Sequence, residues 1–152
     1  MTLAYVGLGS NLGDREGTLR RALELLAGTP GVEVAAVSSL RETDPVGFLE
    51  QPRFLNAAAA IETELGPHAL LDRLLQVESE LGRTRDGPRY GPRRIDLDLL
   101  LYGDVVIDEP GLTLPHPRLH ERRFVLEPLV ELDSGLASPA LGPLAPILAA
   151  LD

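Results

Sequence analysis

The stretch Gly82-Arg83-Thr84-Arg85-Asp86-Gly87-Pro88-Arg89-Tyr90-Gly91-Pro92-Arg93-Arg94-Ile95-Asp96-Leu97-Asp98-Leu99-Leu100-Leu101 joins an arginine-rich loop to an apolar run. The apolar run is interrupted only at Asp96 and Asp98. Because residues i and i+2 lie on one face of a strand, the two carboxylates should point the same way, about 6–7 Å apart. Ile95, Leu97 and Leu99 should then face a core.

Two neighbouring carboxylates repel each other, and a hard divalent cation cancels that repulsion. Carboxylate oxygens are ligands that Mg²⁺ prefers, and arginine binds phosphate through a bidentate, permanently charged group. The stretch therefore predicts a polyphosphate held by Mg²⁺ and arginines. The alternative is a strand with solvated acids beside a solvated basic loop, and an Asp-x-Asp pair alone does not exclude it.

The length of 152 residues suits one domain, residues 1–152, with a substantial core. The chain has no cysteine, which excludes disulfides, thiolate metal sites and a cysteine nucleophile. We expect no membrane span, no signal peptide and no membrane partner, because we find neither an apolar run of 18 residues nor a charged leader. A cytoplasmic monomer is the expectation.

The charge distribution points to a local anion site. The net charge of −9 argues against nucleic acid as a partner. Eight of the 14 basic residues, all of them arginine, nevertheless lie between Arg83 and Arg123. The absence of lysine also excludes a phosphate-binding loop with lysine and a Schiff base.

Hydrophobic periodicity predicts an α+β fold with the element order βαββαβ. The expected strands cover 3–8, 32–40, 54–63 and the Asp96/Asp98 segment, and the expected helices run to about 27 and from 67 to about 81. This order is the ferredoxin-like arrangement, a mostly antiparallel sheet with helices on one face and a site on the other. We expect a turn at 102–105 to return residues 105–107 along the Asp strand as an added hairpin. Short helical pieces are expected at 118–123, 124–132 and 144–151, and a long loop at 41–53.

Several motifs together resemble the 6-hydroxymethyl-7,8-dihydropterin pyrophosphokinase family of folate biosynthesis. The resemblance covers nearly the whole chain. Its strongest part is Arg89-Tyr90-Gly91-Pro92-Arg93-Arg94-Ile95-Asp96-Leu97-Asp98-Leu99-Leu100. The others are Tyr5-Val6-Gly7-Leu8-Gly9-Ser10-Asn11-Leu12, Gln51-Pro52-Arg53-Phe54-Leu55-Asn56, Leu114-Pro115-His116-Pro117 and Arg122-Arg123-Phe124.

The resemblance implies transfer of pyrophosphate from the co-substrate ATP to the hydroxymethyl group of the dihydropterin, with release of AMP. It implies two Mg²⁺ ions on Asp96 and Asp98, with Arg83 and Arg93 as further catalytic residues. The ATP-binding residues would be Glu78, Arg83, Arg85, Arg93, Leu99, Thr113, His116 and Arg122. The pterin pocket would consist of Thr43, Val46, Phe54, Asn56, Tyr90 and Phe124. The sequence departs from the family pattern at Asp44, Leu75, Tyr90 and Gly111.

The chemistry of the residues agrees with these assignments without requiring them. Aromatic rings suit a flat pterin, and an amide such as Asn56 offers both a donor and an acceptor. On the residues alone, the alternative for Phe54 and Phe124 is an ordinary place in the core. The alternative for His116 is a structural hydrogen-bonding group, and that for Asn56 is a turn residue.

Three other functions fit the sequence less well. A ligand-binding regulatory module on this fold would need neither the paired acids nor the arginine loop. An RNA-binding domain would need exposed aromatics on a basic face, whereas aromatics make up 4% of this acidic chain. Another Mg²⁺-dependent nucleotidyltransferase is the nearest rival enzyme.

Overall fold

The computed structural model describes residues 1–11, 13–43, 53–82 and 95–151. The principal sheet contains the strands β1 (Thr2–Ser10), β2 (Val32–Val37), β3 (Arg41–Thr43), β4 (Phe54–Thr63) and β5 (Asp96–Tyr102). The helices are α1 (Arg15–Ala27), α2 (Pro67–Glu80), the 3₁₀ turn η1 (Leu119–Glu121), α3 (Arg123–Leu132) and α4 (Leu144–Ala150). Two small hairpins complete the fold: β6 (Ile107–Glu109) with β7 (Leu112–Leu114), and β8 (Ala137–Ser138) with β9 (Gly142–Pro143).

The sheet has the order β2-β4-β1-β5, all pairs are antiparallel, and β3 pairs with the start of β4. The order of strands and helices is consistent with the predicted ferredoxin-like arrangement. Local signals explain the helix ends. The Asp14 side chain accepts the Gly17 N–H at 3.0 Å at the start of α1, and Pro67 begins α2.

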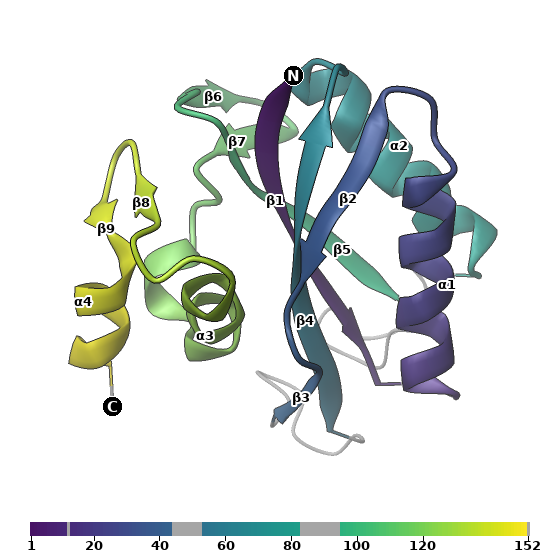
Figure 1. The fold of residues 1–152 in the computed structure, drawn as a ribbon, viewed down its shortest axis with the longest axis horizontal. Helices are drawn as coiled ribbons and strands as arrows, with labels where there is room; N and C mark the ends of the chain where they lie inside the picture. Colours follow the sequence, from purple (N-terminus) through teal and green to yellow (C-terminus); the bar gives the residue numbers. More distant parts are fainter. Residues whose placement is uncertain (12, 44–52, 83–94, 152) are drawn as a thin grey trace.

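Helices cover both faces of the sheet (Figure 1). On one face, α1 and α2 pack on residues such as Val6, Ala59 and Leu97. On the other, α3 and α4 pack on residues such as Ala58 and Leu101. The prediction of helices on one face only is therefore wrong, because β1, β4 and β5 carry apolar side chains on both faces.

The alanine run of β4, Ala57–Ala60, lies between these two layers, and all four residues are buried. Small side chains on both faces of a central strand allow both layers to approach closely. Within the described part of the chain, no helix is long and apolar enough to cross a bilayer.

A bulge divides β5 into two halves. Leu99 lies opposite Val6 and Leu101 opposite Tyr5, so Leu100 has no partner across the ladder. Asp96 and Asp98 precede the bulge, on the face opposite to Leu97 and Leu99.

The predicted hairpin between β5 and residues 105–107 is wrong. The turn exists, with the Val105 N–H donating to the Tyr102 carbonyl, but Ile107 pairs with Leu114 in a separate two-stranded sheet. The outer edge of β5 is occupied by other groups. Its Leu97 N–H donates to Glu78, and its Leu100 carbonyl accepts the His116 N–H.

Truncation of the second layer should destabilise the whole domain. Leu126 of α3 is fully buried, and we expect Leu126→Ala to lower the free energy of unfolding by about 2–5 kcal/mol. Leu74→Ala, in the first layer, should cost a similar amount, whereas Val106→Ala at an exposed position should change little. Chemical denaturation measures all three, and an unchanged main transition in Leu126→Ala would mean that α3 is an independent appendage.

Candidate active site

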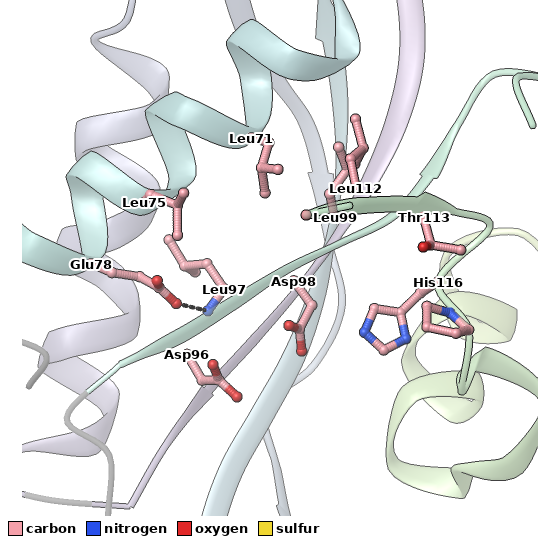
Figure 2. Close-up of a pocket in the computed structure, with 12 residues that line it drawn as sticks. Leu71, Leu75, Glu78, Asp96, Leu97, Asp98, Leu99, Leu112, Thr113 and His116 are labelled. Carbon is pink, nitrogen blue, oxygen red and sulfur yellow. Dashed lines mark hydrogen bonds between the residues drawn. The ribbon is translucent and has the colours of Figure 1, made fainter. Parts of the chain in front are cut away.

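A pocket of about 390 Å³ lies along the outer edge of β5, between α2 and the segment that follows β6 (Figure 2). Six of the predicted site residues line it: Glu78, Asp96, Asp98, Leu99, Thr113 and His116. They come from α2, β5, β7 and the segment after β7, so the fold brings together residues that are up to 38 positions apart in the sequence. Leu71, Leu75, Gly111, Leu112 and Pro117 supply most of the remaining wall, which is apolar.

The two aspartates point to the same side of β5, with the His116 ring across from Asp98 (Figure 2). Both are half-buried, whereas their neighbours Leu97 and Leu99 belong to the core. The predicted alternation of acids and leucines is therefore confirmed.

Glu78 supports this strand at its outer edge. Its side chain is buried, and its carboxylate accepts the Leu97 N–H, which lies between the two aspartates, at 2.8 Å. Since backbone groups alternate in direction along an antiparallel strand, the N–H and C=O of Leu99 face the same edge. The pocket therefore has a backbone donor and acceptor at its floor.

His116 is a neutral hydrogen-bond donor in this arrangement. The Arg118 N–H donates to its Nδ1 atom at 3.2 Å, so the proton of the neutral ring must be on Nε2. Burial lowers the pKa of His116, and the positive charges of Arg122 and Arg118 lower it further, while Asp96 raises it. These effects favour the neutral ring at pH 7.

A second group of predicted residues lies on β3 and β4. The Asn56 side-chain amide donates to the Thr43 hydroxyl, and Phe54 lies on the same face two residues before Asn56. Arg122 stacks over the Phe124 ring, with its guanidinium carbon 5.6 Å from the ring centroid. A predicted phosphate-binding residue thus contacts a predicted pterin-binding residue.

The remaining predicted residues, Arg83, Arg85, Arg93, Val46 and Tyr90, lie outside the described residues. Asp44, one of the departures from the family pattern, does so as well.

Sequence reasoning missed two glycines of β1, which lies between the strand that carries Asn56 and the strand that carries the two aspartates. Gly9 pairs with Asn56 on one side and Asp96 on the other, and Gly7 pairs with Asp98. A Cβ on Gly9 would lie 2.7 Å from the Asn56 side-chain oxygen, so Gly9 faces the site and leaves it open. The signal was the pair Gly7-x-Gly9 inside an alternating strand, where glycine is otherwise unfavourable.

Comparison with known proteins establishes the family. The pattern of the 7,8-dihydro-6-hydroxymethylpterin-pyrophosphokinase (HPPK) family matches residues 5–134. The chain belongs to this family. It is therefore an enzyme, a pyrophosphokinase of the diphosphotransferase class.

Relatives from two bacteria carry the name 2-amino-4-hydroxy-6-hydroxymethyldihydropteridine pyrophosphokinase. That of Bacillus subtilis is 52% identical over 130 residues, which is 86% of this chain and 77% of the relative. That of Pseudomonas aeruginosa is 44% identical over 146 residues, which is 96% of this chain and 90% of the relative.

A solved structure, an HPPK-DHPS in complex with substrates, shares the fold with a TM-score of 0.78 at 11% identity. The match covers 98% of this chain and 43% of that longer chain. At this identity the likeness concerns the fold alone.

The electrostatics of His116 can be tested by NMR titration. We expect its pKa to lie below the ordinary value of about 6.5, with Nε2 protonated in the neutral form. Arg122→Gln removes a positive neighbour and should raise the pKa, whereas Asp96→Asn removes a negative one and should lower it. A pKa that responds to neither change would contradict the geometry described for the ring.

Proposed function

We propose that this HPPK-family enzyme transfers pyrophosphate from ATP to the hydroxymethyl group of 6-hydroxymethyl-7,8-dihydropterin and releases AMP. One observation carries the proposal. Asn56, Gly9 and Asp96 lie side by side on β4, β1 and β5, so an amide and a carboxylate face the same surface across two strand spacings, about 10 Å. Because glycine leaves the middle of this row open, a flat ligand held by Asn56 could extend its hydroxymethyl group toward the aspartates.

On the pterin side, Asn56 supplies a donor and an acceptor for the amide edge of the ring. Phe54 and Phe124 supply aromatic faces for stacking. Thr43 accepts a hydrogen bond from Asn56 and thereby fixes which end of the amide is turned toward the ligand. Val46 and Tyr90 complete the pocket in this proposal.

On the nucleotide side, the apolar walls of the 390 Å³ pocket suit a purine base. The backbone N–H and C=O of Leu99 offer the base edge a hydrogen-bond pair, beside Glu78 and Thr113. His116 donates from Nε2 to a phosphate oxygen. Arg83, Arg85, Arg93 and Arg122 neutralise the phosphate charge.

The donor set at β5 fits Mg²⁺. Among the described residues, no group of three or more His, Cys, Asp and Glu side chains is placed to hold a metal ion. Asp96 and Asp98 would therefore be the ligands that this part of the chain provides. Mg²⁺ is commonly bound by one or two carboxylates together with substrate phosphates and waters. When bound, two such ions would neutralise the charge that develops on the phosphate oxygens.

The reaction is an in-line displacement at the β-phosphorus. The hydroxymethyl oxygen forms a bond to the β-phosphorus while the bond from that phosphorus to the α,β-bridging oxygen breaks. AMP leaves with the bridging oxygen, and the hydroxyl proton passes to solvent. The protein contributes placement of the two substrates and fixed positive charge rather than a covalent intermediate.

Replacement of either aspartate should nearly abolish turnover without unfolding the protein. Asp96→Asn and Asp98→Asn preserve the side-chain shape and leave the core packing of Leu97 and Leu99 unchanged, but each removes a negative charge from the metal-binding surface. The measurement is AMP release with Mg-ATP and the hydroxymethyl dihydropterin, beside a thermal melt of each variant. If the acids were merely solvated, stability would change by less than about 0.5 kcal/mol and turnover not at all.

The same assay separates this proposal from its nearest rival. A pyrophosphokinase releases AMP only when the dihydropterin is present. Release of pyrophosphate would instead indicate a nucleotidyltransferase, and release of ADP a phosphoryl transfer.

Asn56→Ala should weaken dihydropterin affinity far more than ATP affinity. Loss of the amide leaves polar groups of the ligand without partners, which costs about 1–3 kcal/mol in a desolvated pocket. Thr63→Val is a matched control, since Thr63 is a buried polar residue at the opposite end of the same strand. Calorimetry of each variant with each substrate measures the difference, and loss of ATP affinity alone would reverse the assignment of the two subsites.

A further inference from the structure

A cluster of charged and polar side chains joins α3 to β3 beside the Thr43–Asn56 pair. The Arg41 guanidinium donates to Glu127 and to Glu131, both at 2.6 Å. Glu127 and Glu131 lie one helical turn apart on α3, where two negative charges would repel each other without Arg41 between them. Arg41 is therefore the cation that bridges the two glutamates and ties α3 to β3.

Glu131 also holds the chain just before β3. It accepts hydrogen bonds from the Ser39 N–H and the Ser39 hydroxyl, both at 2.6 Å. These bonds and Arg41 lower the pKa of Glu131 to about 2. The carboxylate therefore stays charged, and the cluster stays intact, over the pH range in which the enzyme would be assayed.

The cluster lies on the same face of the sheet as Thr43 and Asn56. Arg41 lies opposite Asn56 in the β3–β4 ladder, and Thr43, two residues further along, is on the same face. On α3, Phe124, Glu127 and Glu131 follow the i, i+3, i+7 spacing and share one side of the helix. The side of α3 that binds Arg41 through Glu127 and Glu131 therefore also carries Phe124.

The opposite face of β3, which carries Glu42, is also bound to a helix. Glu42 points away from Arg41, and it accepts a hydrogen bond from Arg15 of α1 at 2.6 Å. Arg15 also donates to the Arg53 carbonyl, the residue before β4, at 2.9 Å. A strand of only three residues is therefore fixed from α1 on one side and from α3 on the other.

We propose that Arg41 is a positioning residue for the pterin subsite, where it fixes the separation between α3, which carries Phe124, and the β3–β4 pair, which carries Thr43, Phe54 and Asn56. The proposal rests on the proposed function of this surface. Arg41 does not touch the ligand. Its bonds to Glu127 and Glu131 keep the aromatic ring on the helix and the amide on the sheet at a fixed separation.

The test is steady-state kinetics of Arg41→Met, which preserves the aliphatic stem and removes the charge. We expect the KM for the dihydropterin at saturating Mg-ATP to rise about tenfold, because small displacements of binding groups have large effects on affinity. The KM for ATP should stay within about twofold, since none of the cluster residues lines the pocket along β5. Arg21→Gln, which breaks an exposed ion pair with Glu24 on α1, is the matched control and should change neither constant.

A double-mutant cycle with Glu131→Gln shows whether Arg41 affects the dihydropterin KM through its bond to Glu131. If Arg41 acts through Glu131, the two substitutions together should raise the dihydropterin KM by less than the product of their separate effects. If Arg41→Met does not fold, Ser39→Ala provides a milder loosening of the same cluster and should raise the same constant a few-fold.

The proposal is overturned if the variants melt at a lower temperature but keep the dihydropterin KM of the unmodified protein, because the cluster is then structural only. Equal rises in both KM values would also overturn it. Failure of the proposed function gives a different result, since the unmodified protein would then release no AMP in a dihydropterin-dependent manner.

Discussion

The two-residue period of β5 is the constraint on which the site depends. It divides one short strand into leucines that anchor the core and aspartates that face the ligand side. An edge strand can slip or fray, and the Glu78 bond to the Leu97 N–H prevents this by occupying the edge between the two acids. Because Glu78 belongs to α2, the packing of α2 on the core also determines where the two carboxylates of β5 lie.

Charged side chains of both signs lie around this strand, as the proposed function requires for a polyphosphate on an acidic protein. Asp96 and Asp98 face the pocket side of β5. Burial lowers the pKa of His116, and the positive charges of Arg122 and Arg118 lower it further, which favours the neutral ring. Elsewhere, arginines such as Arg41 and Arg15 are paired with glutamates at 2.6 Å and serve to hold elements together. Arginine therefore has two separate uses in this chain, and sequence composition alone does not distinguish them.

Much of the fold follows from local pattern. The range 54–63 predicted for β4 agrees with Phe54–Thr63, and the ends of α1 and α2 lie within about one residue of the prediction. The prediction of a hairpin failed because groups that are distant in the sequence compete for the same backbone edge of β5. Residues 105–107 have strand-forming character, but Glu78 and His116 take the edge of β5 that they would have used. Helical pieces at 124–132 and 144–151 were predicted, but their place on the second face was not, because apolar residues on both faces of a strand do not show which segment covers each face.

The candidate site, like the fold, has residues that the sequence predicts and residues that it does not. Chemistry and spacing predicted Asp96 and Asp98 as a pair, and the resemblance predicted Glu78, Leu99, Thr113 and His116; the structure brings all six to one pocket. Gly7 and Gly9 contribute by lacking side chains, which a search for functional groups does not detect. The bulge at Leu100 has a further consequence for how the sequence can vary. It shifts the alternation of side chains by one residue, so Leu100 and Leu101 both pack in the layer of α3 and α4, whereas Leu97 and Leu99 pack in the layer of α1 and α2. Substitutions that repack that second layer should then leave the direction of the two carboxylates unchanged, so the two halves of β5 can vary separately.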